Sequence, residues 1–82
     1  MNPMNLLTQH TPASYDTWKQ DFDAHAETRM QAGLTLLQLW RDADGGGVTA
    51  LFEVNDRAKA QKWLDAEAQT GGAVTGRFMR TA

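Results

Sequence analysis

The feature of this chain that most constrains its fold is a run of apolar residues with helical spacing that ends at a glycine. Intervals of three and four residues place the run on one stripe of a helix: Tyr15, Trp18, Phe22, Ala26 and Met30. Gly33 follows and ends the stripe. We therefore predict a helix over about 14–32 with Ser14 as its N-cap. The alternative cap is Thr11, with Pro12 at the first helical position.

Four other segments carry strand signals. Residues 34–41 are dense in leucine but too short for a second amphipathic helix before the turn residues at 42–47. Residues 48–54 are rich in β-branched and aromatic side chains, which is typical of the returning strand of a hairpin. Further short strands are predicted at about 4–9 and about 74–80.

A second helix is predicted over about 56–68, capped by Asn55 or Asp56, with glycines at 71–72 marking its far end. Its narrow apolar stripe consists of Ala60, Trp63 and Leu64. Glu67 projects near the middle of that apolar face, where a carboxylate is costly, so we expect the helix to fray there.

The predicted order is β-α-β-β-α-β, which is the ferredoxin-like arrangement of an α+β protein with a four-stranded antiparallel sheet. The 82 residues are enough for one domain, 1–82, with a thin core. The chain has no cysteine, so disulfides cannot reinforce this core. These facts favour stabilisation by a partner subunit.

Both faces of the predicted sheet are partly apolar. The face toward the helices carries Leu6, Leu37, Leu39, Ala50, Phe52, Val54, Val74 and Phe78. Two short helices cover only one face, and burying each large apolar side chain of the other is worth roughly 1.5–3 kcal/mol. We therefore expect a homodimer through the second face, the alternative being a monomer that leaves it in water. The interface residues are predicted to be Leu36, Gln38, Trp40, Leu51 and Met79.

Charge and hydropathy exclude several classes of partner. The chain has a net charge of −2, whereas nucleic-acid binding requires an excess of basic side chains. No apolar run approaches the roughly 20 residues of a membrane span, and no leader pattern precedes the first strand, so a cytoplasmic protein is expected. His10 and His25 have no cysteine beside them, and with the first helix between them a shared metal site is not expected.

Two side chains of the first helix are candidates for chemistry. His25 lies at the edge of the apolar stripe, where it would act as a proton acceptor or simply be held by a neighbouring polar group. Arg29 falls inside the stripe, where we expect it to extend to solvent, with an anionic ligand as the alternative. On the second sheet face, Glu53 and Arg77 are candidates for an ion pair.

Three runs of the chain resemble the small ferredoxin-like dimeric α+β-barrel proteins, a group that includes antibiotic-biosynthesis-monooxygenase-like domains. The runs are YDTWKQDFDAH, QAGLTLLQLWRDADGG and VTALFEVNDRAKAQKWL, and the likeness covers about 4–79. The resemblance implies a dimer whose sheets close into a barrel, with a ligand cleft in each subunit between helices and sheet. Enzymes of the group include cofactor-independent oxygenases of polycyclic aromatic compounds and haem-degrading enzymes. The haem-degrading kind pairs a first-strand asparagine with a second-helix tryptophan and a following histidine; Asn5 and Trp63 match, but no histidine follows Trp63, so no cofactor is expected.

Three functions remain open. The first is binding of a small aromatic or apolar ligand by Trp18, Phe22, His25, Phe52 and Trp63, with Arg29 as a further contact. The second is a cofactor-independent monooxygenase or isomerase acting on an aromatic or polyketide-like compound with His25 as the base. The third is a purely structural dimerisation module.

Overall fold

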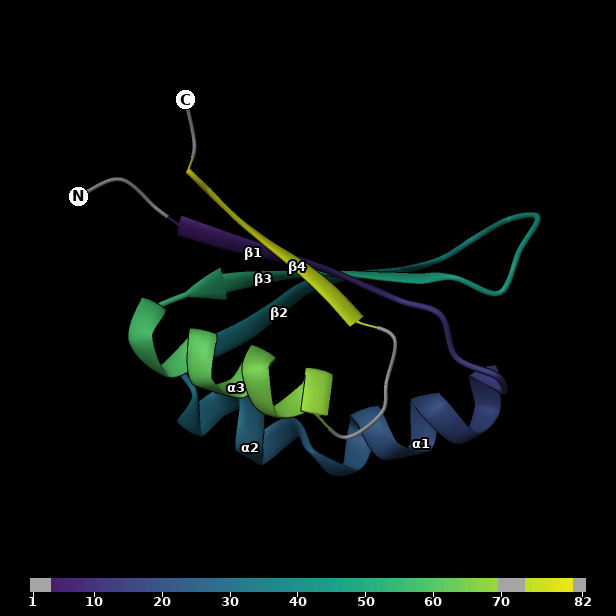
Figure 1. Cartoon of the computed structure of the whole chain (residues 1–82), viewed down its shortest axis with the longest axis horizontal. Coiled ribbons are helices and arrows are strands. Elements are labelled where there is room, and N and C mark those ends of the chain that lie inside the picture. The colour runs from purple at the N-terminus through teal and green to yellow at the C-terminus, as the bar shows by residue number, and fades with distance from the viewer. Residues whose placement is uncertain (1–3, 70–73, 81–82) are drawn as a thin grey trace.

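The computed structural model describes residues 4–69 and 74–80, which form one antiparallel sheet and three helices in the order β-α-α-β-β-α-β (Figure 1). The strands are β1 (Met4–His10), β2 (Leu34–Arg41), β3 (Val48–Val54) and β4 (Val74–Arg80). The helices are α1 (Tyr15–Ala24), α2 (Ala26–Gln31) and α3 (Arg57–Gln69). The strand order is β2-β3-β1-β4, as in the predicted ferredoxin-like α+β fold. Within the two described ranges, no helix is long and apolar enough to cross a membrane.

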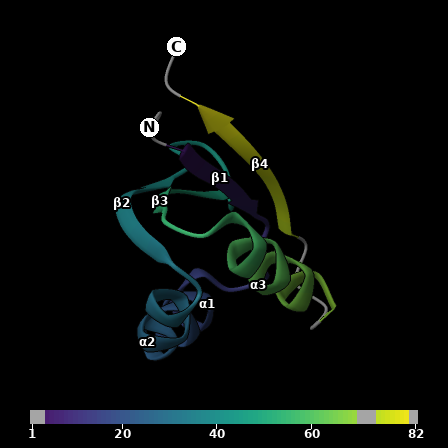
Figure 2. The ribbon, with the colours of Figure 1, turned by 90° about the vertical axis from the view of Figure 1, so that its left-hand side faces the viewer.

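All three helices lie on the same side of the sheet (Figures 1 and 2). The burial of β3 follows this arrangement, because Ala50, Phe52 and Val54 are buried while the intervening Leu51 is half-buried and Glu53 is exposed. The core beneath the helices consists of Leu6, Phe22, Leu34, Ala50, Phe52, Val54, Ala60 and Trp63. Among the described elements, none covers the opposite face of the sheet.

The first helical segment is split, contrary to the single helix predicted over 14–32. Ser14 caps α1 as predicted, accepting a hydrogen bond from the Thr17 backbone N–H at 3.5 Å. The break occurs at His25, which has φ −101° and ψ 18° and serves as the C-cap of α1 and the N-cap of α2. Near the break, the side chains of His25 and Arg29 donate hydrogen bonds to the carbonyls of residues 21 and 22, which also accept from the His25 backbone N–H.

The third helix runs two residues past Glu67, so the predicted fraying is wrong. Asp56 caps α3, its carboxylate accepting from the Lys59 backbone N–H at 3.0 Å. Glu67 remains helical and half-buried because it has a charged neighbour, Arg29, whose positive charge it stabilises. The glycines at 71–72 lie outside the described residues.

A β-bulge in β2 changes the predicted face of one residue. Leu36 pairs with Phe52 and therefore lies on the helix side of the sheet, whereas Gln38 pairs with Leu51 on the open side. Leu37 is the extra residue between them. Strict alternation across the strand had placed Leu36 on the open side, so its assignment to a dimer interface through that face is wrong.

The open face of the sheet retains the other predicted interface residues. Register with Leu51 and its neighbours places the following residues there: Leu7, Gln38, Trp40, Leu51, Arg77 and Met79. Trp40 is 48% exposed, and Leu51 and Met79 are half-buried. Glu53 shares this face with Arg77, but β1 runs between them, so they are not direct cross-strand partners.

Replacing Gly33 with alanine is expected to lower the free energy of unfolding by about 1–2 kcal/mol. Gly33 has φ +74°, and a Cβ there would lie 3.1 Å from the backbone nitrogen of Asp56. Urea unfolding followed by tryptophan fluorescence measures the loss. Gly45→Ala is the control, because its Cβ would meet only the Asp42 side chain at 3.5 Å or beyond, so its effect should stay below about 0.5 kcal/mol. Equal losses in the two variants would contradict this role of Gly33.

Candidate functional site

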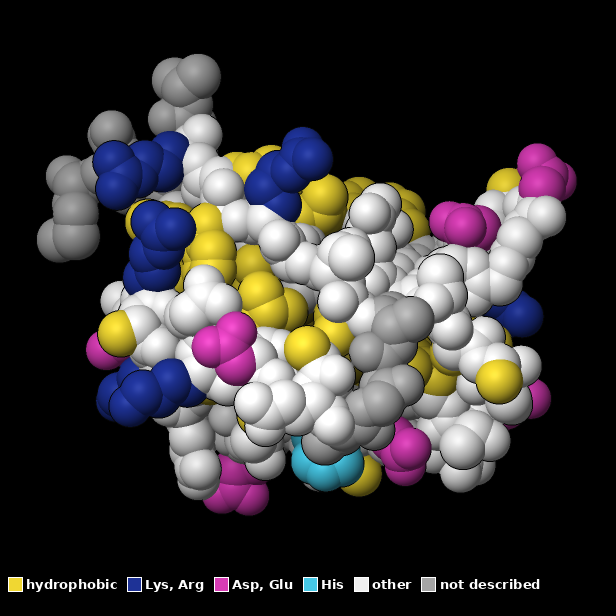
Figure 3. Space-filling model, viewed as in Figure 1, with side chains coloured by type: hydrophobic (Ala, Val, Ile, Leu, Met, Phe, Trp, Pro, Cys, Tyr) yellow, Lys and Arg dark blue, Asp and Glu magenta, His cyan; other side chains and the backbone are white. Residues whose placement is uncertain are grey.

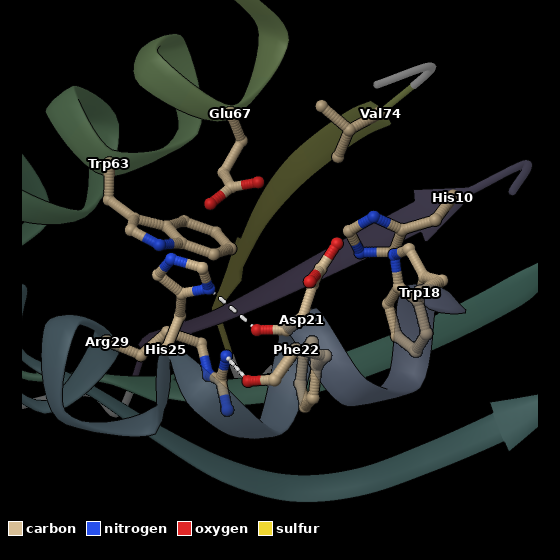
Figure 4. Close-up of a pocket in the computed structure, with 9 residues that line it drawn as sticks. All are labelled: His10, Trp18, Asp21, Phe22, His25, Arg29, Trp63, Glu67 and Val74. Carbon is tan, nitrogen blue, oxygen red and sulfur yellow. Dashed lines mark hydrogen bonds between the residues drawn. The ribbon is translucent and has the colours of Figure 1, made fainter. Parts of the chain in front are cut away.

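A cleft of about 450 Å³ opens on the helix side of the sheet, between α1 and α3 (Figure 4). This volume falls in the usual range of small-molecule sites. Five residues predicted from the sequence line it: Trp18, Phe22, His25, Arg29 and Trp63. Four residues that were not predicted as site residues join them: His10, Asp21, Glu67 and Val74.

A row of rings forms the wall and floor of the cleft. Trp18 stacks on Phe22 with ring centroids 4.8 Å apart, and His10 lies 5.0 Å from Trp18. Phe52 continues the row toward Trp63, at 6.4 Å from Phe22 and 5.7 Å from Trp63. Phe52 is fully buried and does not line the cleft, so it supports the site from the core rather than contacting a ligand.

Arg29 is held inside the protein, so the expected extension to solvent is wrong. Its side chain is only 7% exposed, and its guanidinium carbon lies 3.6 Å from the centroid of the Phe22 ring. It also donates a hydrogen bond to the Phe22 carbonyl at 2.5 Å. Burial lowers the pKa of Arg29, an effect that the carboxylates of Asp23 and Glu67 oppose. Arg29 thus supplies a fixed positive charge beneath the aromatic wall.

His25 lies at the exposed edge of the cleft and is oriented by the backbone. Its Nδ1 lies 2.6 Å from the carbonyl oxygen of Asp21, and because a carbonyl only accepts, Nδ1 carries the proton. In the neutral ring, this leaves the lone pair on Nε2. The break between α1 and α2 creates this arrangement, since it places a histidine at a helix end with a carbonyl within reach.

His10 is a titratable residue of the cleft that sequence reasoning did not predict as a site residue. It closes β1 on the helix side, is 9% exposed, and has its Nε2 3.0 Å from the hydroxyl oxygen of Thr8. Burial, together with the positive charge of Arg29, lowers the pKa of His10 to about 4. His10 is therefore neutral at pH 7. The only sequence signal was the alternation of Leu6, Thr8 and His10 along β1, which points all three toward the helices.

Lowering the pH from 7 to 4 is expected to remove up to about 3 kcal/mol of folding free energy through His10. Its folded pKa of about 4 lies below the ordinary 6.5, so the unfolded chain takes up the proton first. The stabilisation is complete above pH 6.5 and is lost as the pH falls toward 4. Urea unfolding across this range should give a flatter pH dependence for His10→Gln than for the wild type. Parallel curves would contradict this role.

Trp63 carries an unpaired polar group at the cleft. Its side chain is 8% exposed, and its Nε1–H is buried without a hydrogen-bond partner in the described part of the chain. Buried donors are rarely left without an acceptor. The Trp63 ring itself lines the cleft on the α3 side.

The structure separates the two residues that matched part of the haem-degrading pattern. Asn5 pairs with Glu53 and Met79 on the neighbouring strands, which places it on the open face of the sheet. Its side-chain amide donates a hydrogen bond to the Phe52 carbonyl at 3.2 Å. Trp63 lies in the core and cleft on the helix side. Among the residues placed in the structure, no three His, Cys, Asp or Glu side chains gather as a metal site.

Comparison with known proteins places the chain in a sequence family and a structural class. No curated protein matches it. Rv0793 from Mycobacterium tuberculosis superposes with a TM-score of 0.61 at 22% identity, over 92% of each chain. A protein from an uncultured marine organism, described as a dimeric ferredoxin-like protein, superposes with a TM-score of 0.57 at 13% identity, over 100% of this chain and 97% of that one. These identities support a shared fold alone. The family described as a domain of unknown function, DUF3303, matches residues 6–66, and the chain belongs to this family.

Proposed function

We propose that the chain forms a homodimer and binds a small aromatic or apolar ligand in the cleft between α1 and α3. The observation that carries the ligand-binding part is a cleft of about 450 Å³ with stacked rings on one wall and the Trp63 ring on another. Flat apolar ligands gain most from such walls, because ring stacking adds to the burial of apolar surface.

The dimer is proposed to form through the open face of the sheet. Trp40, Leu51 and Met79 give this face an apolar centre, and Gln38 and Arg77 add polar groups around it. Facing a second copy would remove these side chains from water and close the two sheets into a barrel. The dimeric ferredoxin-like protein of similar fold supports this assembly.

Binding is tested with two neutral aromatic probes, 2-naphthol and 4-phenylbutan-1-ol, by thermal unfolding and NMR titration. We expect both to raise the unfolding temperature and to perturb the cleft. Trp18→Leu should weaken binding by about tenfold, because it removes a ring face worth about 1–1.5 kcal/mol. Trp40→Leu is the matched control on the opposite face and should bind as the wild type does. No effect of either probe would leave the purely structural dimer as the better account.

A second candidate function rests on the orientation of His25. With the proton fixed on Nδ1 by the Asp21 carbonyl, Nε2 is available as a general base at the edge of the cleft. This arrangement suits a cofactor-independent monooxygenase or isomerase that deprotonates an aromatic substrate. Oxidation of anthrone by molecular oxygen, yielding anthraquinone and water, is a suitable assay. The wild type should accelerate it and His25→Ala should not; equal rates for the two proteins would remove His25 from this role.

A further inference from the structure

Given the homodimer proposed above, on which this inference rests, we infer that Trp40 of each subunit docks into a hollow on the open face of the partner's β4. Trp40 lies on the open face of β2, and its side chain is 48% exposed. The strands β2 and β4 are the two edges of the sheet, with β3 and β1 between them (Figure 2). Trp40 is therefore too far from the hollow of its own chain to fill it.

The hollow lies where β1 and β4 run side by side. It has a volume of about 180 Å³ and is lined by Leu7, Gln9, Thr75, Gly76 and Arg77. This lining suits an indole ring, because it combines an apolar side chain, oxygen atoms that can accept from the indole N–H, and a guanidinium that can lie against the ring. Figure 3 shows the same mixture at larger scale, with a basic side chain among hydrophobic ones along the upper, open side of the sheet.

Cross-strand pairing places Trp40 and the hollow at the same height of the sheet. One row of paired residues crosses the open face from edge to edge at this height: Trp40, Thr49, Gln9 and Thr75. A two-fold axis parallel to the strands, midway across the sheet, exchanges the two edges and keeps the height. It lays Trp40 over the partner's Thr75, and the partner's Trp40 over Thr75, as a self-complementary interface requires. Packed sheets lie about 10 Å apart with interdigitating side chains, so a tryptophan reaches the facing sheet.

The neighbouring row of the open face is complementary about the same axis. It consists of Gln38, Leu51, Leu7 and Arg77. The axis lays Leu51 over the partner's Leu7, and it lays Gln38, whose side chain carries an acceptor, over the partner's Arg77. An axis across the strands at the level of Leu51 would instead bring Arg77 against the partner's Arg77, and such a contact between like charges is unfavourable. The charges therefore favour the axis parallel to the strands.

Two single substitutions should weaken the dimer from opposite sides of this contact. Trp40→Ala is expected to raise the dissociation constant at least about 30-fold, because a tryptophan seated in a pocket is a common hot spot of binding energy. Thr75→Phe should raise it about tenfold, since the added ring occupies the space that the partner's Trp40 would fill. Both side chains are exposed in the single subunit, so both variants should fold, which far-ultraviolet circular dichroism verifies.

An equimolar mixture of the two variants tests the contact directly. In their heterodimer, the shortened position 40 faces the enlarged position 75, and the native Trp40 faces the native Thr75. Both contacts are then filled, whereas the homodimer of one variant has two voids and that of the other has two overcrowded contacts. Native mass spectrometry separates the three dimers by mass and should show the heterodimer well above the share expected from random exchange.

Thr35→Phe is the matched control for the mixture. Thr35 lies on the open face of β2, paired with Glu53, two rows from Trp40. Mixed with Trp40→Ala, this variant should give a heterodimer at the random share only. An axis across the strands would place Trp40 against the partner's Thr35, so enrichment with Thr35→Phe rather than with Thr75→Phe would overturn the inference.

The remaining outcomes separate the inference from the dimer on which it rests. A dimeric wild type with no heterodimer enrichment for Thr75→Phe would overturn the docking of Trp40 and leave the open-face dimer intact. A wild type that is monomeric in the same spectra would overturn the inference together with the proposed dimer.

Discussion

Replacing Phe52 with alanine is expected to lower the free energy of unfolding by about 3–5 kcal/mol. Phe52 is fully buried and lies between Phe22 and Trp63 in the aromatic row. Its ring centroid is 6.4 Å from that of Phe22 and 5.7 Å from that of Trp63. Its removal leaves a cavity in the core beneath the helices. Urea unfolding measures the loss.

Two further variants keep this prediction testable if Phe52→Ala does not fold. Phe52→Leu retains most of the volume and should cost less than the alanine variant. Met30→Ala is the surface control, because Met30 is 73% exposed and its loss should change stability by less than about 0.5 kcal/mol. A Phe52→Leu variant no less stable than Met30→Ala would contradict the placement of Phe52 at the centre of the core.

Leu51, the neighbour of Phe52 in β3, is the site of the second large predicted effect, which is on the stability of the dimer rather than on that of the core. Leu51→Glu is expected to weaken the dimer by more than about 100-fold, because it places a carboxylate at the centre of the proposed interface. Leu51 pairs with Gln38 and Leu7 and lies on the open face of the sheet, whereas Phe52 lies on the helix side. Sedimentation velocity across a protein dilution series measures the dissociation constant.

A charge at a distant exposed position serves as the control for Leu51→Glu. Met30→Glu introduces the same charge on α2, on the helix side of the sheet, and should leave the dimer unchanged. Far-ultraviolet circular dichroism verifies that both variants fold. Equal dissociation constants for Leu51→Glu and the wild type would remove the open face from the interface.

Much of the fold could be predicted because its signals are local. The strand signals at 34–41 and 48–54 correspond to β2 and β3. Gly33 correctly marked the end of the helical segment that precedes β2. The bulge at Leu37 could not be predicted, since it depends on how β2 pairs with β3 rather than on either strand alone. One inserted residue then reversed the face of Leu36.

The candidate site was only half predictable for the same reason. Trp18, Phe22 and His25 share one helical stripe, so their proximity follows from spacing. His10 and Glu67 come from elements far apart in the chain, and only the packing of α3 and β1 around α1 brings them to the cleft. The break at His25 also escaped notice, because side-chain donors to backbone carbonyls leave no periodic mark in a sequence.

The central claim is that the open face of the sheet pairs with the same face of a second copy, and native mass spectrometry of the wild-type protein purified without added ligand tests it most directly. We predict a species near twice 9.1 kDa at micromolar concentration. The same measurement detects any small molecule retained in the cleft. A single species of 9.1 kDa at every accessible concentration would show that the apolar open face is tolerated in water and would contradict the dimer.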